Sequence, residues 1–149
     1  MNIKSQILKQ IHDLLDNKIN EAKKNVGQLK ESRNTETKSS AGDKYETGRV
    51  MMQFELEKNE VQLGKFLKLK NDLQQIEFSQ KQVFAELGSL VVTNQGNYFL
   101  SVGIGKVDVE NTTYYVLSPA SPIGKLLYGR KEGENFTFNN KKFVIKSVF

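Results

Sequence analysis

The sequence contains no cysteine and no tryptophan, a single histidine and only two prolines. The lack of cysteine excludes disulfide bonds and thiolate metal sites, and it is typical of proteins of the reducing cytoplasm. His12 has no second imidazole with which to share a metal ion, so we interpret it as a surface or packing residue. Both prolines lie after Ser118, so no proline breaks a helix in the longer, N-terminal part of the chain.

A long apolar run is also missing. Apolar residues make up 38% of the chain, and the N-terminal residues lead directly into an amphipathic pattern. We therefore expect no signal peptide, no membrane-spanning helix and a cytoplasmic location. The net charge of +5 is spread over both halves of the chain. Such a charge is compatible with an acidic or nucleic-acid-associated partner, but it is too dilute to predict direct binding of a DNA duplex.

Two long helices are predicted for residues 1–79. Over residues 3–31, apolar side chains recur at steps of three and four, as in a coiled coil. A second pattern covers residues 43–79, and residues 32–46 form a predicted tip rich in turn and cap residues. The first seam consists of Leu8, Ile11, Leu15, Ile19, Ala22, Val26 and Leu29. The second seam consists of Met51, Phe54, Phe66, Leu69, Leu73 and Ile76.

The two seams match when the chain is folded back at about residue 38, with partner numbers that total about 76. This register places Ala22 opposite Phe54, and Val26 opposite Val50 or Met51. We therefore predict an antiparallel hairpin within one chain and a monomeric protein. The alternative is that each helix pairs with a helix of another chain.

The period of the pattern changes after a predicted connector at residues 80–88. Residues 89–149 alternate as strands do, with turn residues between the strands, and predict a small domain with a mostly antiparallel sheet. One short helix is expected, with Ser121 as N-cap, Pro122 at its first position and Gly129 at its end. The predicted fold class is α+β, a long N-terminal helical hairpin followed by a small antiparallel-sheet domain with one short helix.

Two segments resemble the bacterial Gre transcript-cleavage factors, GreA and GreB. Residues 121–134, which begin Ser-Pro-Ile-Gly-Lys-Leu-Leu-Tyr-Gly, resemble the C-terminal signature of that family, which lies in an FKBP-like domain. The second segment is Gly42-Asp43-Lys44-Tyr45-Glu46, which resembles the acidic Gly-Asp-x-x-Glu at the tip of the family's coiled coil. Its spacing and its place between the two helices are the same as in the family.

The resemblance implies a transcription elongation factor that is not an enzyme by itself. Gre factors bind RNA polymerase, insert the coiled-coil tip in its secondary channel and stimulate Mg²⁺-dependent cleavage of backtracked nascent RNA by the polymerase. In this chain, Asp43 and Glu46 would contact an Mg²⁺ shared with the polymerase active site, with none bound stably by the factor alone. Four basic residues near the tip would contact RNA or polymerase: Arg33, Lys38, Lys44 and Arg49.

Other interpretations stay open at this point. Asp43 and Glu46 also have the spacing of a capping box at a helix start. Residues 47–50 are Thr-Gly-Arg-Val, where the family usually has Asn-Ala-Glu-Tyr, so a Gre-like regulator or inhibitor that binds polymerase without stimulating cleavage is an alternative. Two further classes are a proline isomerase, by analogy with the FKBP-like fold alone, and a coiled-coil adaptor.

Overall fold

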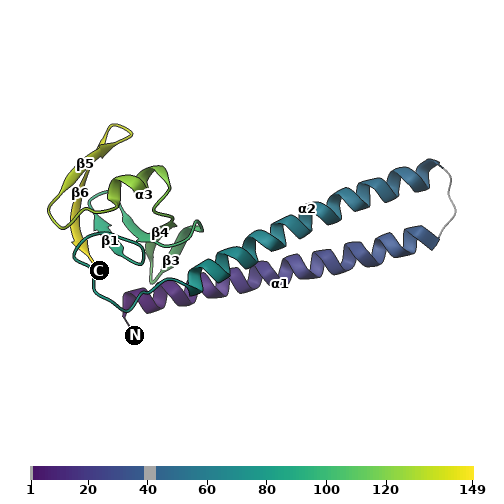
Figure 1. Ribbon diagram of the computed structural model, residues 1–149, viewed down its shortest axis with the longest axis horizontal. Coiled ribbons are helices and arrows are strands. Elements are labelled where there is room, and N and C mark those ends of the chain that lie inside the picture. Colours follow the sequence, from purple (N-terminus) through teal and green to yellow (C-terminus); the bar gives the residue numbers. More distant parts are fainter. Residues whose placement is uncertain (1, 39–42) are drawn as a thin grey trace. The chain divides into compact units, whose positions relative to one another are not determined.

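The structure is a computed structural model that describes the backbone of residues 2–38 and 43–149, and the side chains of that part except those of residues 35–46. Two long helices are followed by a sheet and a short helix, so the fold class is α+β, as predicted (Figure 1). The elements in chain order are α1 (Ile3–Lys38), α2 (Asp43–Gln74), β1 (Leu90–Thr93), β2 (Asn97–Leu100), β3 (Gly105–Val109), β4 (Thr112–Leu117), α3 (Pro122–Leu127), β5 (Asn135–Phe138) and β6 (Lys141–Val148).

The chain divides into two compact units, and each is described by itself. The helical unit is Leu14–Lys70. The sheet unit combines Met1–Asp13 with Asn71–Phe149. The beginning of α1 and the end of α2 therefore belong to the sheet unit. The division expected from the sequence, at residues 79 and 88, followed the change in secondary structure and stays a prediction.

In the helical unit, α1 and α2 pack antiparallel through a narrow seam (Figure 1). The α1 side consists of the buried residues Leu15, Ile19, Ala22 and Val26. The α2 side consists of Met52, Leu56, Asn59, Leu63, Phe66 and Lys70, at alternating steps of four and three. This spacing keeps one face of each helix against the other over several turns, which confirms the predicted antiparallel hairpin.

The predicted register of the hairpin is wrong. Asp16 pairs with Lys70, whose Nζ lies 2.7 Å from the carboxylate, and Arg33 donates to the Gln53 side chain at 3.1 Å. Partner numbers therefore total about 86 rather than about 76. Phe54, predicted to face Ala22, is 74% exposed.

The shift of the register follows from where the helices end. α1 continues to Lys38 instead of ending near residue 31, because residues 32–38 contain neither glycine nor proline and sustain a helix. Residues that we assigned to the tip are therefore the last two turns of α1. α2 ends at Gln74 rather than near residue 79. Its last turn is closed by the N–H groups of Gln75 and Ile76, which donate to the carbonyls three residues before them instead of four.

In the sheet unit, six strands form one sheet in the order β3-β4-β2-β1-β6-β5. All neighbouring strands are antiparallel except β2 and β4, so the sheet is mostly antiparallel, as predicted. Two tight hairpins join β3 to β4 and β5 to β6. The residues at their turns, Glu110 with Asn111 and Asn139 with Asn140, have positive φ, as a turn that matches strand twist requires. α3 packs on the sheet through Leu127, which joins a core cluster with Tyr98 and Phe143.

Candidate functional site

The acidic pair identified in the sequence belongs to the first turn of α2. Asp43 is the first residue of that helix and Glu46 lies three residues further on, while α1 ends at Lys38. The side chains of these residues and of Lys44 lie outside the described residues. The backbone alone therefore places the pair at the closed end of the hairpin, the end opposite Leu14 and Lys70.

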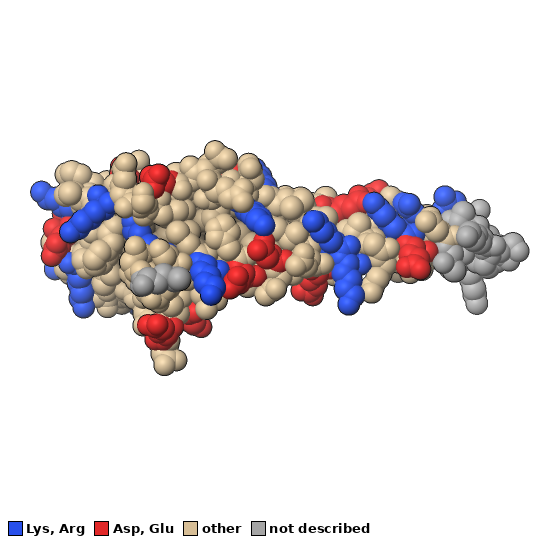
Figure 2. Space-filling model, turned by 90° about the horizontal axis from the view of Figure 1, so that it is seen from below, with Lys and Arg blue, Asp and Glu red and all other residues tan. Residues whose placement is uncertain are grey.

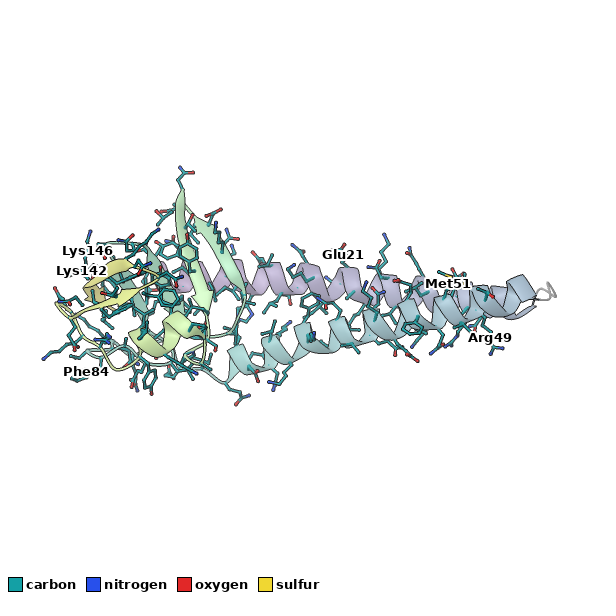
Figure 3. All side chains as sticks on the ribbon, turned by 90° about the horizontal axis from the view of Figure 1, so that it is seen from above. Glu21, Arg49, Met51, Phe84, Lys142 and Lys146 are labelled. Atoms are coloured by element: carbon teal, nitrogen blue, oxygen red, sulfur yellow. The ribbon has the colours of Figure 1, made fainter. Side chains whose placement is uncertain are left out.

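Two of the predicted basic residues have described side chains. Arg33 is half-buried and donates to Gln53, whose amide in turn donates to Glu57 at 3.1 Å. Arg49 is exposed and projects from α2 (Figure 3). The two guanidinium groups are thus placed differently: that of Arg33 links α1 to α2, and that of Arg49 reaches solvent one turn beyond Glu46.

An apolar face on the outer side of α2 was missed by sequence reasoning, which assigned part of it to the seam. Val50, Met51, Phe54 and Val61 are 60%, 66%, 74% and 59% exposed. Met51 belongs to the part of α2 near the closed end (Figure 3), and charged side chains of both signs lie along the hairpin (Figure 2). An exposed apolar group of this size is typical of a surface that meets a partner.

The signal that separates this outer face from the seam is the spacing. The true seam keeps steps of three and four without interruption but includes two polar residues, Asn59 and Lys70. The outer face is interrupted: Phe54 and Val61 are seven positions apart, and Glu57 lies between them on the same side of the helix. A search for unbroken spacing would have found the seam, whereas a pattern that tolerates interruptions includes Met51 and Phe54 of the outer face.

The second segment that resembles Gre factors is built around α3. Ser121 is the N-cap, as predicted: its Oγ accepts from the Gly124 N–H at 3.2 Å and donates to the Ser118 carbonyl at 2.6 Å. The Gly129 N–H donates to the Ala85 carbonyl at 2.6 Å, and the Ala85 N–H donates to Arg130 at 2.7 Å. This segment therefore fixes the connector after α2 to the end of α3.

Comparison with known proteins gives little beyond these observations. No family model matches the chain, and no curated protein matches it. A solved structure described as "Structure of the transcription factor Gfh1" aligns with 94% of this chain and 94% of its own, at 17% identity and a TM-score of 0.41. A likeness of that level decides neither family nor function, so the functional argument rests on the residues themselves.

Metal and membrane sites were sought in the same part of the chain. Among the residues that the structure describes, no three His, Cys, Asp or Glu residues gather as a metal site. None of the described helices is both long enough and apolar enough to cross a bilayer. The segment that resembles the Gre tip, residues 42–46, lies outside that search, and its sequence contains two carboxylates, Asp43 and Glu46.

We expect Gly124→Ala to destabilise the sheet unit. A Cβ at this position would lie 2.2 Å from the Ser118 carbonyl oxygen, a backbone atom that is itself held by Ser121. Overpacking of this kind costs about 1–3 kcal/mol. Urea unfolding followed by tyrosine fluorescence measures the loss. Gly103→Ala is the matched control, because its Cβ would meet no atom within 4 Å; equal stability of the two variants would contradict the geometry of α3.

Proposed function

We propose that this protein is a transcription elongation factor that binds RNA polymerase and stimulates cleavage of backtracked RNA. In this proposal the closed end of the hairpin enters the secondary channel, and Asp43 and Glu46 reach the polymerase active site. The protein is not an enzyme by itself, because the RNA is cleaved by the polymerase. The sheet unit contributes to anchoring on the polymerase.

The observation that carries the proposal is the place of the acidic pair. A Gre-like Gly-Asp-x-x-Glu lies where α1 has ended and α2 begins, and the two helices pair antiparallel behind it. The part of α1 in the helical unit, residues 14–38, rises roughly 37 Å at the usual 1.5 Å per residue. A hairpin of that length supports a role in which the end with Asp43 and Glu46 reaches a site roughly 37 Å from Leu14.

The donor set fits a shared Mg²⁺ better than a resident one. Mg²⁺ prefers six oxygen ligands in octahedral geometry and keeps several waters, so two carboxylates supplement existing ligands but do not form a complete site. When bound, a second metal ion supplies charge stabilisation for phosphodiester cleavage. Asp43 and Glu46 would each present an oxygen to it, and the exposed Arg49 would limit carboxylate repulsion or contact RNA phosphate.

A second candidate function is regulation of polymerase without cleavage. It is favoured by residues 47–50, which depart from the family pattern just after the acidic pair. Two of the neighbouring side chains, Val50 and Met51, are large, apolar and exposed. A factor that fills the channel through such contacts would inhibit or modulate the polymerase instead of adding a metal ligand.

Transcript cleavage on a backtracked polymerase complex tests the proposal. With 5′-labelled RNA, we expect the protein to bind the complex and to shorten the RNA when Mg²⁺ is present. Binding without shortening would favour the regulator. Failure to bind polymerase at all would contradict both functions and leave a coiled-coil adaptor.

A further inference from the structure

A cavity of about 180 Å³ lies in the sheet unit, where the first turn of α1 meets the segment that follows α2. Its lining includes Asn2 and Lys4 from the start of the chain, Phe78, Gln80 and Lys81 from the later segment, and Phe149. The volume is below the range of about 300–1,000 Å³ that holds drug-sized ligands. It corresponds to roughly six water molecules at about 30 Å³ each, so only a small ligand fits.

Lys4 is the unusual residue of this cavity. The residue is only 8% exposed, and within the described part of the chain its ammonium group makes no hydrogen bond or ion pair, although the nitrogen itself keeps some access to solvent. Burial lowers its pKa, because the charged form loses water. The residue also lies in the first turn of a 36-residue helix, where a positive charge is unfavourable. The stem of Lys4 is therefore packed, while its charged end has access to the cavity.

The charges around the cavity are mostly positive. Lys81 adds a second ammonium group. The first N–H groups of α1 have no acceptor within the helix. Asn2 accepts from the Ser5 N–H at 2.8 Å through its side-chain oxygen, which leaves its NH₂ group to donate. Glu77 precedes Phe78 in the chain, and hydrogen bonds from the Ser79 hydroxyl and N–H lower its pKa and keep it ionised, but it is not one of the residues that line the cavity.

The apolar walls of the cavity are fixed in place. Phe78 stacks on the fully buried Phe99, with ring centroids 5.2 Å apart. Phe149 is held through its backbone, which exchanges two hydrogen bonds with Leu90, at 2.9 and 3.0 Å. The Phe78 ring is thus held by stacking, whereas Phe149 is held by its backbone and is 42% exposed. A positive group beside two aromatic rings matches a ligand that has an anionic group on a flat apolar body.

We propose that this cavity binds a small organic anion, with its carboxylate or phosphate group at Lys4 and its apolar body against Phe78 and Phe149. The anion supplies the counter-charge that Lys4 lacks and also interacts favourably with the N-terminus of α1. This site is separate from the closed end of the hairpin, and the inference does not depend on the proposed role in transcription.

Titration of the whole protein with benzoate and with phenyl phosphate tests the site by two-dimensional NMR. We expect saturable shifts of the backbone amides of residues 2–5 and 78–81, and the tighter of the two probes identifies the preferred anionic group. Phenol, which lacks the charge, and inorganic phosphate, which lacks the ring, are each expected to bind at least about tenfold more weakly. Shifts centred elsewhere, or no saturation by either aromatic anion, would overturn the proposal.

The variant Lys4→Met keeps the apolar stem and removes the charge. It is expected to fold, because it deletes a desolvated ammonium group, and to lose at least about tenfold in affinity for the better probe. Lys9→Met is the matched control, an exposed lysine of the same helix, and should bind as the wild type does. Equal affinities of the two variants would show that Lys4 does not hold the anion, and the wild-type shifts decide the question if Lys4→Met does not fold.

Discussion

The double variant Asp43→Asn, Glu46→Gln is expected to bind RNA polymerase as the wild type does and to lose stimulation of RNA cleavage. Both changes keep the size of the side chain and remove the charge that a magnesium ion requires. Removing one group that stabilises the charge developing in a transition state typically lowers the catalytic rate by a factor of about 10²–10³. We therefore expect the cleavage rate of the backtracked complex to fall by at least about a hundredfold, while co-elution with polymerase persists.

The design also separates metal binding from helix capping. Asn is about as good an N-cap as Asp, so Asp43→Asn alone preserves a cap at this position while it weakens metal binding. If the carboxylates only cap α2, this single variant should cleave normally. If they bind the metal, its activity should drop and should recover in part when the Mg²⁺ concentration is raised, because mass action compensates a weaker site.

A matched control guards against a general effect of charge. Glu55→Gln removes one negative charge from an exposed position of the same helix, beyond the first turn of α2. It should cleave as the wild type does. A loss equal to that of the double variant would indicate that the net charge of α2, not the acidic pair, governs the activity.

Much of the fold follows from local patterns. Steps of three and four predict two long helices, and the Ser-Pro start and glycine end predict α3, since these signals act within a few residues of the chain. The turns between strands are similar, because Asn and Gly tolerate positive φ. In each case the determining interactions are local, so a single sequence is enough to predict the element.

The register of the hairpin is not a local property. α2 carries apolar residues on two faces, and only the face with unbroken spacing packs against α1. Lys70 is tolerated in the seam because Asp16 pairs with it at 2.7 Å, and Asn59 because its amide donates to the Glu55 carbonyl at 2.8 Å. The pair of Asp16 and Lys70 joins the two helices and cannot be inferred until they are aligned, so the apolar pattern of α2 alone does not decide which face packs.

The candidate sites show the same contrast. The place of the acidic pair depends on the start of α2, which the sequence predicts at about residue 43 and which the structure has at Asp43. The cavity at Lys4 depends on contact between the first turn of α1 and residues more than 70 positions later. From the sequence alone, Lys4 is one more basic residue of an amphipathic helix, and nothing in its neighbours indicates burial.

The second large effect is expected for the seam itself. Leu56→Ala should destabilise the hairpin by about 2–5 kcal/mol, because Leu56 is 2% exposed and its removal leaves a cavity against α1. Phe54→Ala, only two residues away, should change stability by no more than about 0.5 kcal/mol, because Phe54 is 74% exposed. Helix unfolding in urea, followed by circular dichroism, measures both.

This pair of variants decides between the two registers, since the register with partners totalling about 76 places Phe54 in the seam and makes the opposite prediction.

The same variants test the pairing of helices within one chain. If α2 packed against another chain, the midpoint of unfolding would rise with protein concentration, and Leu56→Ala would lower the midpoint without removing that dependence. A midpoint independent of concentration, with Leu56 sensitive and Phe54 not, is the result that a hairpin within one chain requires. Phe54 would then be an apolar side chain kept in water without benefit to folding, which is the behaviour expected of a residue that serves contact with a partner.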